Sequence, residues 1–194
     1  MLFRSPFPIP EEQRGLMRRL ADAAEVGIHP SYRSSDREEL FSVEKARLEE
    51  IIGGAVTRSR QHYLRFRLPE TYRALIQAGL SSDASMGYGD AVGWRAGTNL
   101  PFPWYDLERE ASTRLTVLPF AAMDVTLRNY LGLSARASAE RVRALAERVL
   151  PYGGPFCLLW HNSSFAAEYG WAGWWDMYRD LATSLTAMGV NPPS

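Results

Sequence analysis

The sequence contains little cysteine, and neither sign of charge is in excess. Cys157 is the only cysteine among 194 residues, which excludes an intramolecular disulfide and a zinc finger built on cysteine pairs. Because Cys157 lies in an apolar run, we expect a small core hydrophobe rather than a nucleophile. Lysine plus arginine and aspartate plus glutamate number 22 each. This balance gives no electrostatic reason to expect nucleic acid or an anionic membrane as a partner.

Long apolar stretches are also missing. No stretch approaches the roughly 18–20 continuous apolar residues of a membrane span. The first residues, MLFRSPFPIPEE, lack the apolar segment of a signal peptide, and this favours a cytoplasmic location. The chain shows no internal repeat and no low-complexity linker. Its length suits one domain, 1–194, with a sizeable core.

Helix and strand signals alternate along the chain. Helices are predicted over about 10–24, from a capping box at Ser35-Asp36-Arg37-Glu38 to Gly53-Gly54, from Pro69 to Gly79, after a cap at Ser138, and over 171–185. Strand-like runs are EVGIH (25–29), AVTRSRQH (55–62) and FCLLWH (156–161). Such alternation indicates an α/β fold with a parallel sheet and helices outside it, either open or closed into a barrel.

Apolar residues at helical spacing predict which helix faces are buried. In the first two helices these are Leu16, Met17, Leu20 and Ala24, then Leu40, Phe41, Val43, Leu48, Ile51 and Ile52. In the last two they are Val142, Leu145 and Val149, then Trp171, Trp174, Trp175, Tyr178, Leu181 and Leu185. An aromatic stripe of this kind is more typical of core packing than of a platform for sugars.

All three histidines follow a predicted strand. His29 ends EVGIH, His62 follows VTRSR, and His161 ends CLLWH. Functional groups of parallel α/β sheets gather beyond the carboxyl ends of the strands, so we expect the three imidazoles at one rim. A single histidine there is more often an ordinary polar residue. Three of three favour a site, because histidine is the commonest metal ligand and titrates near neutral pH.

Other polar residues are predicted at the same rim. Arg60 and Tyr63 flank His62, and Asp83 follows Gly79-Leu80 where another strand would end. An arginine, an aspartate and three histidines suit metal-assisted hydrolysis. In that chemistry a cation polarises a carbonyl and acidifies a water, and a histidine protonates the leaving group.

The ordered motifs IHPSY, RQHYL, WRAGTNLPF and LLWHN resemble the polysaccharide deacetylases of the NodB-homology type, in particular a bacterial branch with HPSY and RQHY signatures. The resemblance covers roughly 25–174. It implies a distorted (β/α) barrel and a divalent metal, usually zinc. It also implies hydrolysis of N- or O-acetyl groups on an acetylated polysaccharide or oligosaccharide.

The resemblance assigns roles position by position. His29 matches a metal ligand, and His161 matches the general acid toward the leaving amine or alkoxide. Arg60 would orient the acid–base network, and the amide of Tyr63 would donate to the oxyanion of the tetrahedral intermediate. Asp83 stands where the family has an aspartate that tunes the general acid.

Two positions depart from the family pattern. Arg33 stands where a second ligand histidine belongs, and His62 stands where the motif has proline, so His62 is our candidate for the substitute ligand. The aspartate pair that supplies a ligand and the general base has no counterpart before His29. The only acids there lie in or beside a predicted helix: Glu11, Glu12, Asp22 and Glu25. We therefore expect a fragment that begins inside the barrel and lacks its first strand or strands.

Two further functions stay open. The missing aspartates and Arg33 favour a non-catalytic carbohydrate-binding domain that has lost the metal and the base, whereas Arg60 and His161 favour an enzyme. A phosphate or nucleotide site would depend on the glycines of 87–97. Their spacing fits neither G-x-G-x-x-G nor a P-loop.

Overall fold

The computed structural model describes residues 9–189, except the side chains of Asp36 and Glu38, as two compact units interleaved along the chain. The first unit contains the described residues up to Ser85 together with Phe102–Val117, and the second contains Met86–Pro101 together with those from Leu118 onward. Both units mix helices and strands, which confirms the mixed α/β class. The single domain over 1–194 stays a prediction.

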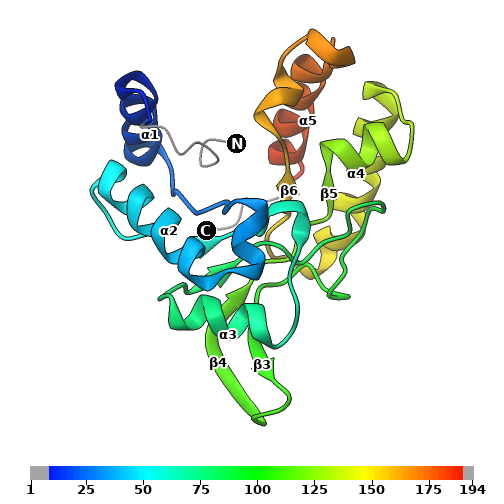
Figure 1. The fold of residues 1–194 in the computed structure, drawn as a ribbon. Helices are drawn as coiled ribbons and strands as arrows, with labels where there is room; N and C mark the ends of the chain where they lie inside the picture. Colours follow the sequence, from blue (N-terminus) through cyan, green and yellow to red (C-terminus); the bar gives the residue numbers. More distant parts are fainter. Residues whose placement is uncertain (1–8, 190–194) are drawn as a thin grey trace. The chain divides into compact units, whose positions relative to one another are not determined.

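The first unit carries three α-helices and two short 3-10 turns. The helices are α1 (Glu11–Ala23), α2 (Glu38–Ile52) and α3 (Glu70–Gln77), and the turns are η1 (Tyr32–Asp36) and η2 (His62–Leu64). Helices α1 and α2 pack on each other, as the blue and light-blue ribbons of Figure 1 show. Gly53 ends α2 with a left-handed φ of 70°, as the sequence predicted.

Two expectations for these helices are wrong. Arg37, not Ser35, is the N-cap of α2, and no side chain caps the helix. The Ser35 hydroxyl instead donates to the Tyr32 carbonyl at 2.9 Å, because the preceding turn η1 uses it locally. Val43 is 63% exposed, and Leu16 and Leu20 are exposed as well. Helix α1 contacts chiefly α2, so the buried stripe is narrower than the apolar pattern indicates.

The first unit contains an open four-stranded sheet in the order β1-β2-β4-β3. Its strands are β1 (Arg58–Ser59), β2 (Ser82–Asp83), β3 (Phe102–Asp106) and β4 (Ala111–Val117). Strands β1, β2 and β4 run parallel, and β3 pairs antiparallel with β4. The predicted strand EVGIH reduces to a parallel bridge between Ile28 and Ser59.

Helix α3 is tethered to the β3–β4 hairpin, beside which Figure 1 shows it. The Arg73 guanidinium donates to both carboxylate oxygens of Asp106, at 2.7 and 2.8 Å. These bonds hold the pKa of the Asp106 carboxyl below its usual value.

The second unit packs helices around a two-stranded parallel pair. The pair is β5 (Ala122–Met123) with β6 (Leu158–Leu159), and the helices are α4 (Ala135–Val149) and α5 (Trp174–Ala187). Shorter turns are η3 (Thr126–Tyr130), η4 (Leu150–Tyr152), η5 (Asn162–Phe165) and η6 (Glu168–Gly170). The core of this unit includes Ala122, Leu127, Val142, Leu145, Phe156, Trp171, Trp174, Leu181 and Leu185.

The second unit confirms most of the predicted faces and corrects one cap. The Ser134 hydroxyl, not Ser138, caps α4 by accepting from the Ala137 amide at 3.3 Å, and Ser138 lies buried inside the helix. Trp171 and Trp174 are buried as predicted, whereas Trp175 is half exposed. The aromatic stripe is therefore core over most of its length.

No sheet among residues 9–189 closes into a barrel, since the strands form one open sheet and one pair. The described helices also include none that is long and apolar enough to cross a bilayer.

Gly87, in the second unit, lies against the buried ring of Phe120. A Cβ at Gly87 would lie 2.2 Å from two atoms of that ring. We expect Gly87→Ala to lower the free energy of unfolding by about 1–3 kcal/mol, because an overpacked core must shift. Urea unfolding measures this. Gly89→Ala is the matched control, since nothing lies within 4 Å of a Cβ there, and equal losses in both variants would contradict the prediction.

Candidate functional site

His29 and His62 lie together in the first unit. The parallel bridge between Ile28 and Ser59 sets two backbone segments side by side, so the residues that follow them emerge at one edge. The two imidazole centroids are 4.7 Å apart, with the rings tilted by 31°. His29 and His62 are therefore neighbours, as their places at the ends of predicted strands indicated.

The hydrogen bond of His29 defines its tautomer. Its Nδ1 lies 2.8 Å from the carbonyl oxygen of Arg60. Because a carbonyl oxygen only accepts hydrogen bonds, Nδ1 carries the proton in the neutral ring and Nε2 keeps its lone pair. An imidazole held through Nδ1–H by a carbonyl is the form that binds metals through Nε2.

The surroundings of His29 also favour the neutral ring. Loss of water around the imidazole lowers the pKa of His29 to about 4, although the residue as a whole remains accessible to solvent. The hydrogen bond to the Arg60 carbonyl opposes this shift, and the nearby His62 adds to it. His29 is therefore uncharged at neutral pH, as a metal ligand must be.

We expect this shift to appear in the pH dependence of stability. The pKa of His29 in the folded chain, about 4, lies below the usual histidine value of 6.5. As the pH falls through that window, the unfolded chain takes up a proton that the folded chain does not. The contribution of His29 to the free energy of unfolding is therefore complete above about pH 6.5 and declines toward pH 4. In urea titrations His29→Gln should lose less stability than the wild type between about pH 7 and pH 5. An equal loss in both proteins would contradict the assigned pKa.

Tyr63 follows His62 in a strained backbone conformation. Tyr63 and Leu64 have φ values of 55° and 53°, in the left-handed region that non-glycine residues rarely adopt. The Tyr63 ring stacks on the His62 ring at 4.9 Å and is 74% exposed. The conformation thus displays an aromatic ring beside the histidine pair. The predicted oxyanion role of the Tyr63 amide stays a prediction.

Arg60 is anchored to the segment that follows β2. Its Nε donates to the Ala84 carbonyl at 3.0 Å, and its own carbonyl accepts from His29. One residue later, the Gln61 amide donates to the Ser85 hydroxyl at 2.8 Å. The backbone that carries both histidines is therefore fixed to the end of β2.

Asp83 is the centre of that anchorage. Its buried carboxylate accepts from the Ser59 hydroxyl at 2.7 Å, and from the hydroxyl and the amide of Ser85, each at 2.9 Å. Burial raises the pKa of Asp83, and these hydrogen bonds oppose the shift. Asp83 therefore supports the backbone of His62 through Ser85 and Gln61.

In the second unit, His161 pairs with Asp124. His161 Nδ1 lies 2.6 Å from one carboxylate oxygen, and the His161 amide donates to the other at 2.8 Å. The Ser164 hydroxyl and the Val125 amide also donate to this carboxylate. Asp124 is fully buried, whereas the His161 side chain is 40% exposed. The pair fixes the orientation of the imidazole through Nδ1.

Asp124, and not the predicted Asp83, is the aspartate beside His161, and Asp124 was not predicted from the sequence. Asp124 follows β5, which pairs in parallel with β6, and His161 follows β6. The run FAAMD ends in an acid just as CLLWH ends in a histidine, and this signal was available. His29 and His62 belong to the first unit and His161 to the second, so the rim shared by all three stays a prediction.

The described side chains do not form a complete metal site. Across residues 9–189, no group of three or more His, Cys, Asp or Glu side chains is placed to hold a metal ion. A catalytic zinc site takes three protein ligands. His29 and His62 lie near each other, and the described residues do not complete such a site.

Comparisons with solved structures identify the architecture. A candidate polysaccharide deacetylase from Mycobacterium smegmatis matches with a TM-score of 0.66 and 16% identity, over 95% of this chain and 71% of that one. PuuE allantoinase matches with a TM-score of 0.63 and 12% identity, over 92% and 59%. The chain therefore shares its fold with these two structures. At such low identity the likeness extends to the fold alone. No family model and no curated protein match the sequence.

Proposed function

We propose that the protein hydrolyses N- or O-acetyl groups of an acetylated polysaccharide or oligosaccharide. The pairing of His161 with Asp124 carries this proposal, because an exposed imidazole held through Nδ1 by a buried carboxylate is the arrangement of a general acid. The NodB-like fold and the ordered motifs support it. A cleft that only binds sugars has no need of such a pair.

The chemistry of His161 follows from its two ring nitrogens. Nδ1–H donates to Asp124, so the proton that is transferred sits on Nε2. When the carbon–nitrogen or carbon–oxygen bond to the acetyl group breaks, Nε2–H protonates the departing amine or alkoxide. Asp124 holds the ring orientation and stabilises the imidazolium before the transfer. The Ser164 hydroxyl fixes the carboxylate in turn.

We further propose that His29 and His62 supply two ligands to a divalent metal ion, zinc first among them. His29 would bind through Nε2, which the Arg60 carbonyl leaves unprotonated. When bound, such an ion polarises an acetyl carbonyl. Asp83, Ser85 and Gln61 hold the backbone of the pair in place.

The test is acetate release from a panel of N-acetylated and O-acetylated oligosaccharides, with and without added zinc. We expect zinc-dependent release from at least one member. Binding of an oligosaccharide without any release of acetate would instead favour the non-catalytic carbohydrate-binding function. Neither binding nor release across the panel would contradict both functions.

A further inference from the structure

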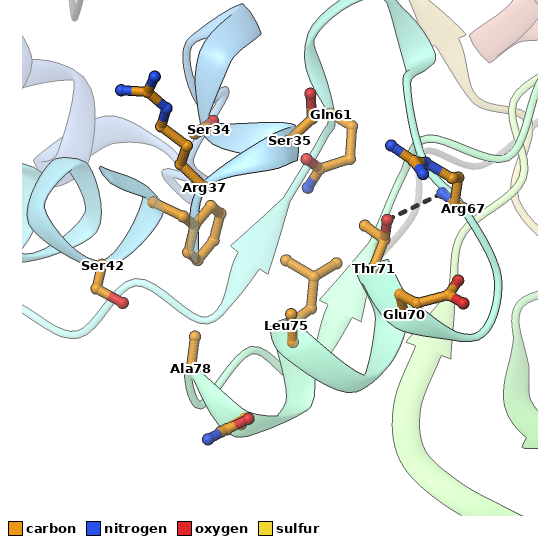
Figure 2. A pocket seen from close by; sticks show the side chains of 13 residues that line it. Ser34, Ser35, Arg37, Ser42, Gln61, Arg67, Glu70, Thr71, Leu75 and Ala78 are labelled. Atoms are coloured by element: carbon orange, nitrogen blue, oxygen red, sulfur yellow. Dashed lines mark hydrogen bonds between the residues drawn. The ribbon is translucent and has the colours of Figure 1, made fainter. Parts of the chain in front are cut away.

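A cavity of about 410 Å³ lies in the first unit, between η1, the start of α2, and α3. We call it the η1–α3 cavity, and Figure 2 shows it from close by. Its lining includes Phe41, Gln61, Arg67, Thr71 and Leu75. The volume is that of a site for one small molecule.

The Gln61 side chain gives the cavity a chemical preference. Gln61 is only 2% exposed, and its Nε2 has no hydrogen-bond partner among the described residues. In Figure 2 its carboxamide points into the space between η1 and α3. A buried N–H without a partner is costly and uncommon in folded proteins. The geometry therefore calls for an acceptor atom in the cavity.

Further donors line the same cavity. Arg67 and Thr71 also line the cavity, and Figure 2 shows both beside the start of α3. The Thr71 hydroxyl oxygen accepts from the Arg67 amide at 2.9 Å, so its hydrogen can be donated. Phe41 and Leu75 supply an apolar wall. One carboxylate, Glu70, also lines the cavity, but the amide, hydroxyl and guanidinium donors outnumber it and favour an oxyanion over a neutral group.

We propose that the η1–α3 cavity binds a small organic anion. Its carboxylate or phosphate accepts from Gln61 Nε2 and the Thr71 hydroxyl and pairs with Arg67, and its carbon skeleton lies on Phe41 and Leu75. The proposal does not depend on the proposed function, since none of the three histidines lines the cavity.

The test uses three aromatic probes that differ in the head group: benzoate, phenyl phosphate and the neutral benzamide. Calorimetry gives affinity, and ¹⁵N NMR reports the Gln61 side-chain amide. We expect benzoate or phenyl phosphate to shift the Gln61 signal and to bind about 10–100-fold more tightly than benzamide. The tighter of the two identifies the head group. Equal binding of benzamide, or no shift of Gln61 with either anion, would overturn the proposal.

Two variants test the donors separately. Gln61→Leu and Thr71→Val should each lower the affinity for the more tightly bound anion by about 10–100-fold, because each removes a donor to a charged acceptor. Gln13→Leu, on exposed α1, is the matched control and should bind as the wild type does. If Gln61→Leu fails to fold, the affinity of Thr71→Val for the anion tests the proposal. Unchanged affinity in the folded donor variants would show that the cavity does not hold the anion.

Discussion

Asp124→Asn should lower kcat for acetate release by about 10³–10⁴-fold while the fold persists. Four donors converge on the two carboxylate oxygens of Asp124: the His161 ring and amide, the Ser164 hydroxyl and the Val125 amide. Asparagine replaces one oxygen by an NH₂ group, so at least one donor would face another donor. The negative charge that stabilises the imidazolium is lost as well.

His161→Ala should lower kcat by about 10²–10⁴-fold, the usual range for a lost general acid, with the metal affinity unchanged. Ser163→Ala is the matched control on η5, because Ser163 is exposed and its neighbour Ser164 is the serine that holds Asp124. Steady-state kinetics and circular dichroism measure activity and folding together. Full activity in His161→Ala would show that His161 is an ordinary polar residue at a strand end.

The second large effect concerns the metal. His29→Ala should weaken zinc binding by roughly 100-fold or more, since a lost ligand acts on affinity before it acts on chemistry. Calorimetric titration of the metal-free protein measures this, and His161→Ala serves as the histidine control with unchanged affinity. Wild-type affinity in His29→Ala would remove His29 from the metal site.

His62→Ala decides whether His62 is the substitute ligand. Its ring lies 4.7 Å from that of His29, so a shared ion predicts a loss of zinc affinity comparable to that of His29→Ala. If His62 only borders the site, zinc stays bound and activity falls modestly. That second outcome would contradict the ligand role, and it would leave His62 as a support for the Tyr63 ring.

Helices and strand ends could be predicted from the sequence better than the side-chain contacts between them. The helix that ends at Gly53 and the pairing of His29 with His62 follow from local rules, namely a left-handed glycine and the common edge of parallel strands. Asp124 could not be found from periodicity, because β5 has two residues and no alternation to detect. Val43 was misplaced because its exposure depends on which neighbouring helix covers α2, and a single sequence does not encode that visibly.

The functional carboxylates illustrate the same limit. Asp83 ends β2 and Asp124 directly follows β5, so each acid stands at the end of a two-residue strand. Their hydrogen bonds distinguish them. The Asp83 carboxylate accepts from the hydroxyls of Ser59 and Ser85, whereas the Asp124 carboxylate accepts from the imidazole of His161. Long-range contacts of this kind depend on the register between strands, and for two-residue strands the register leaves little trace in composition.

The strand order β1-β2-β4-β3 has a consequence for synthesis on the ribosome. Strand β4 lies between β2 and β3, although it is the last of the four in the chain. The sheet of the first unit is therefore incomplete until Val117 has emerged, by which time residues 86–101 of the second unit have already left the exit tunnel. The hairpin β3–β4 is a local pairing, so we expect it to form first and to dock onto β2 as one piece. Neither unit corresponds to a continuous stretch of nascent chain.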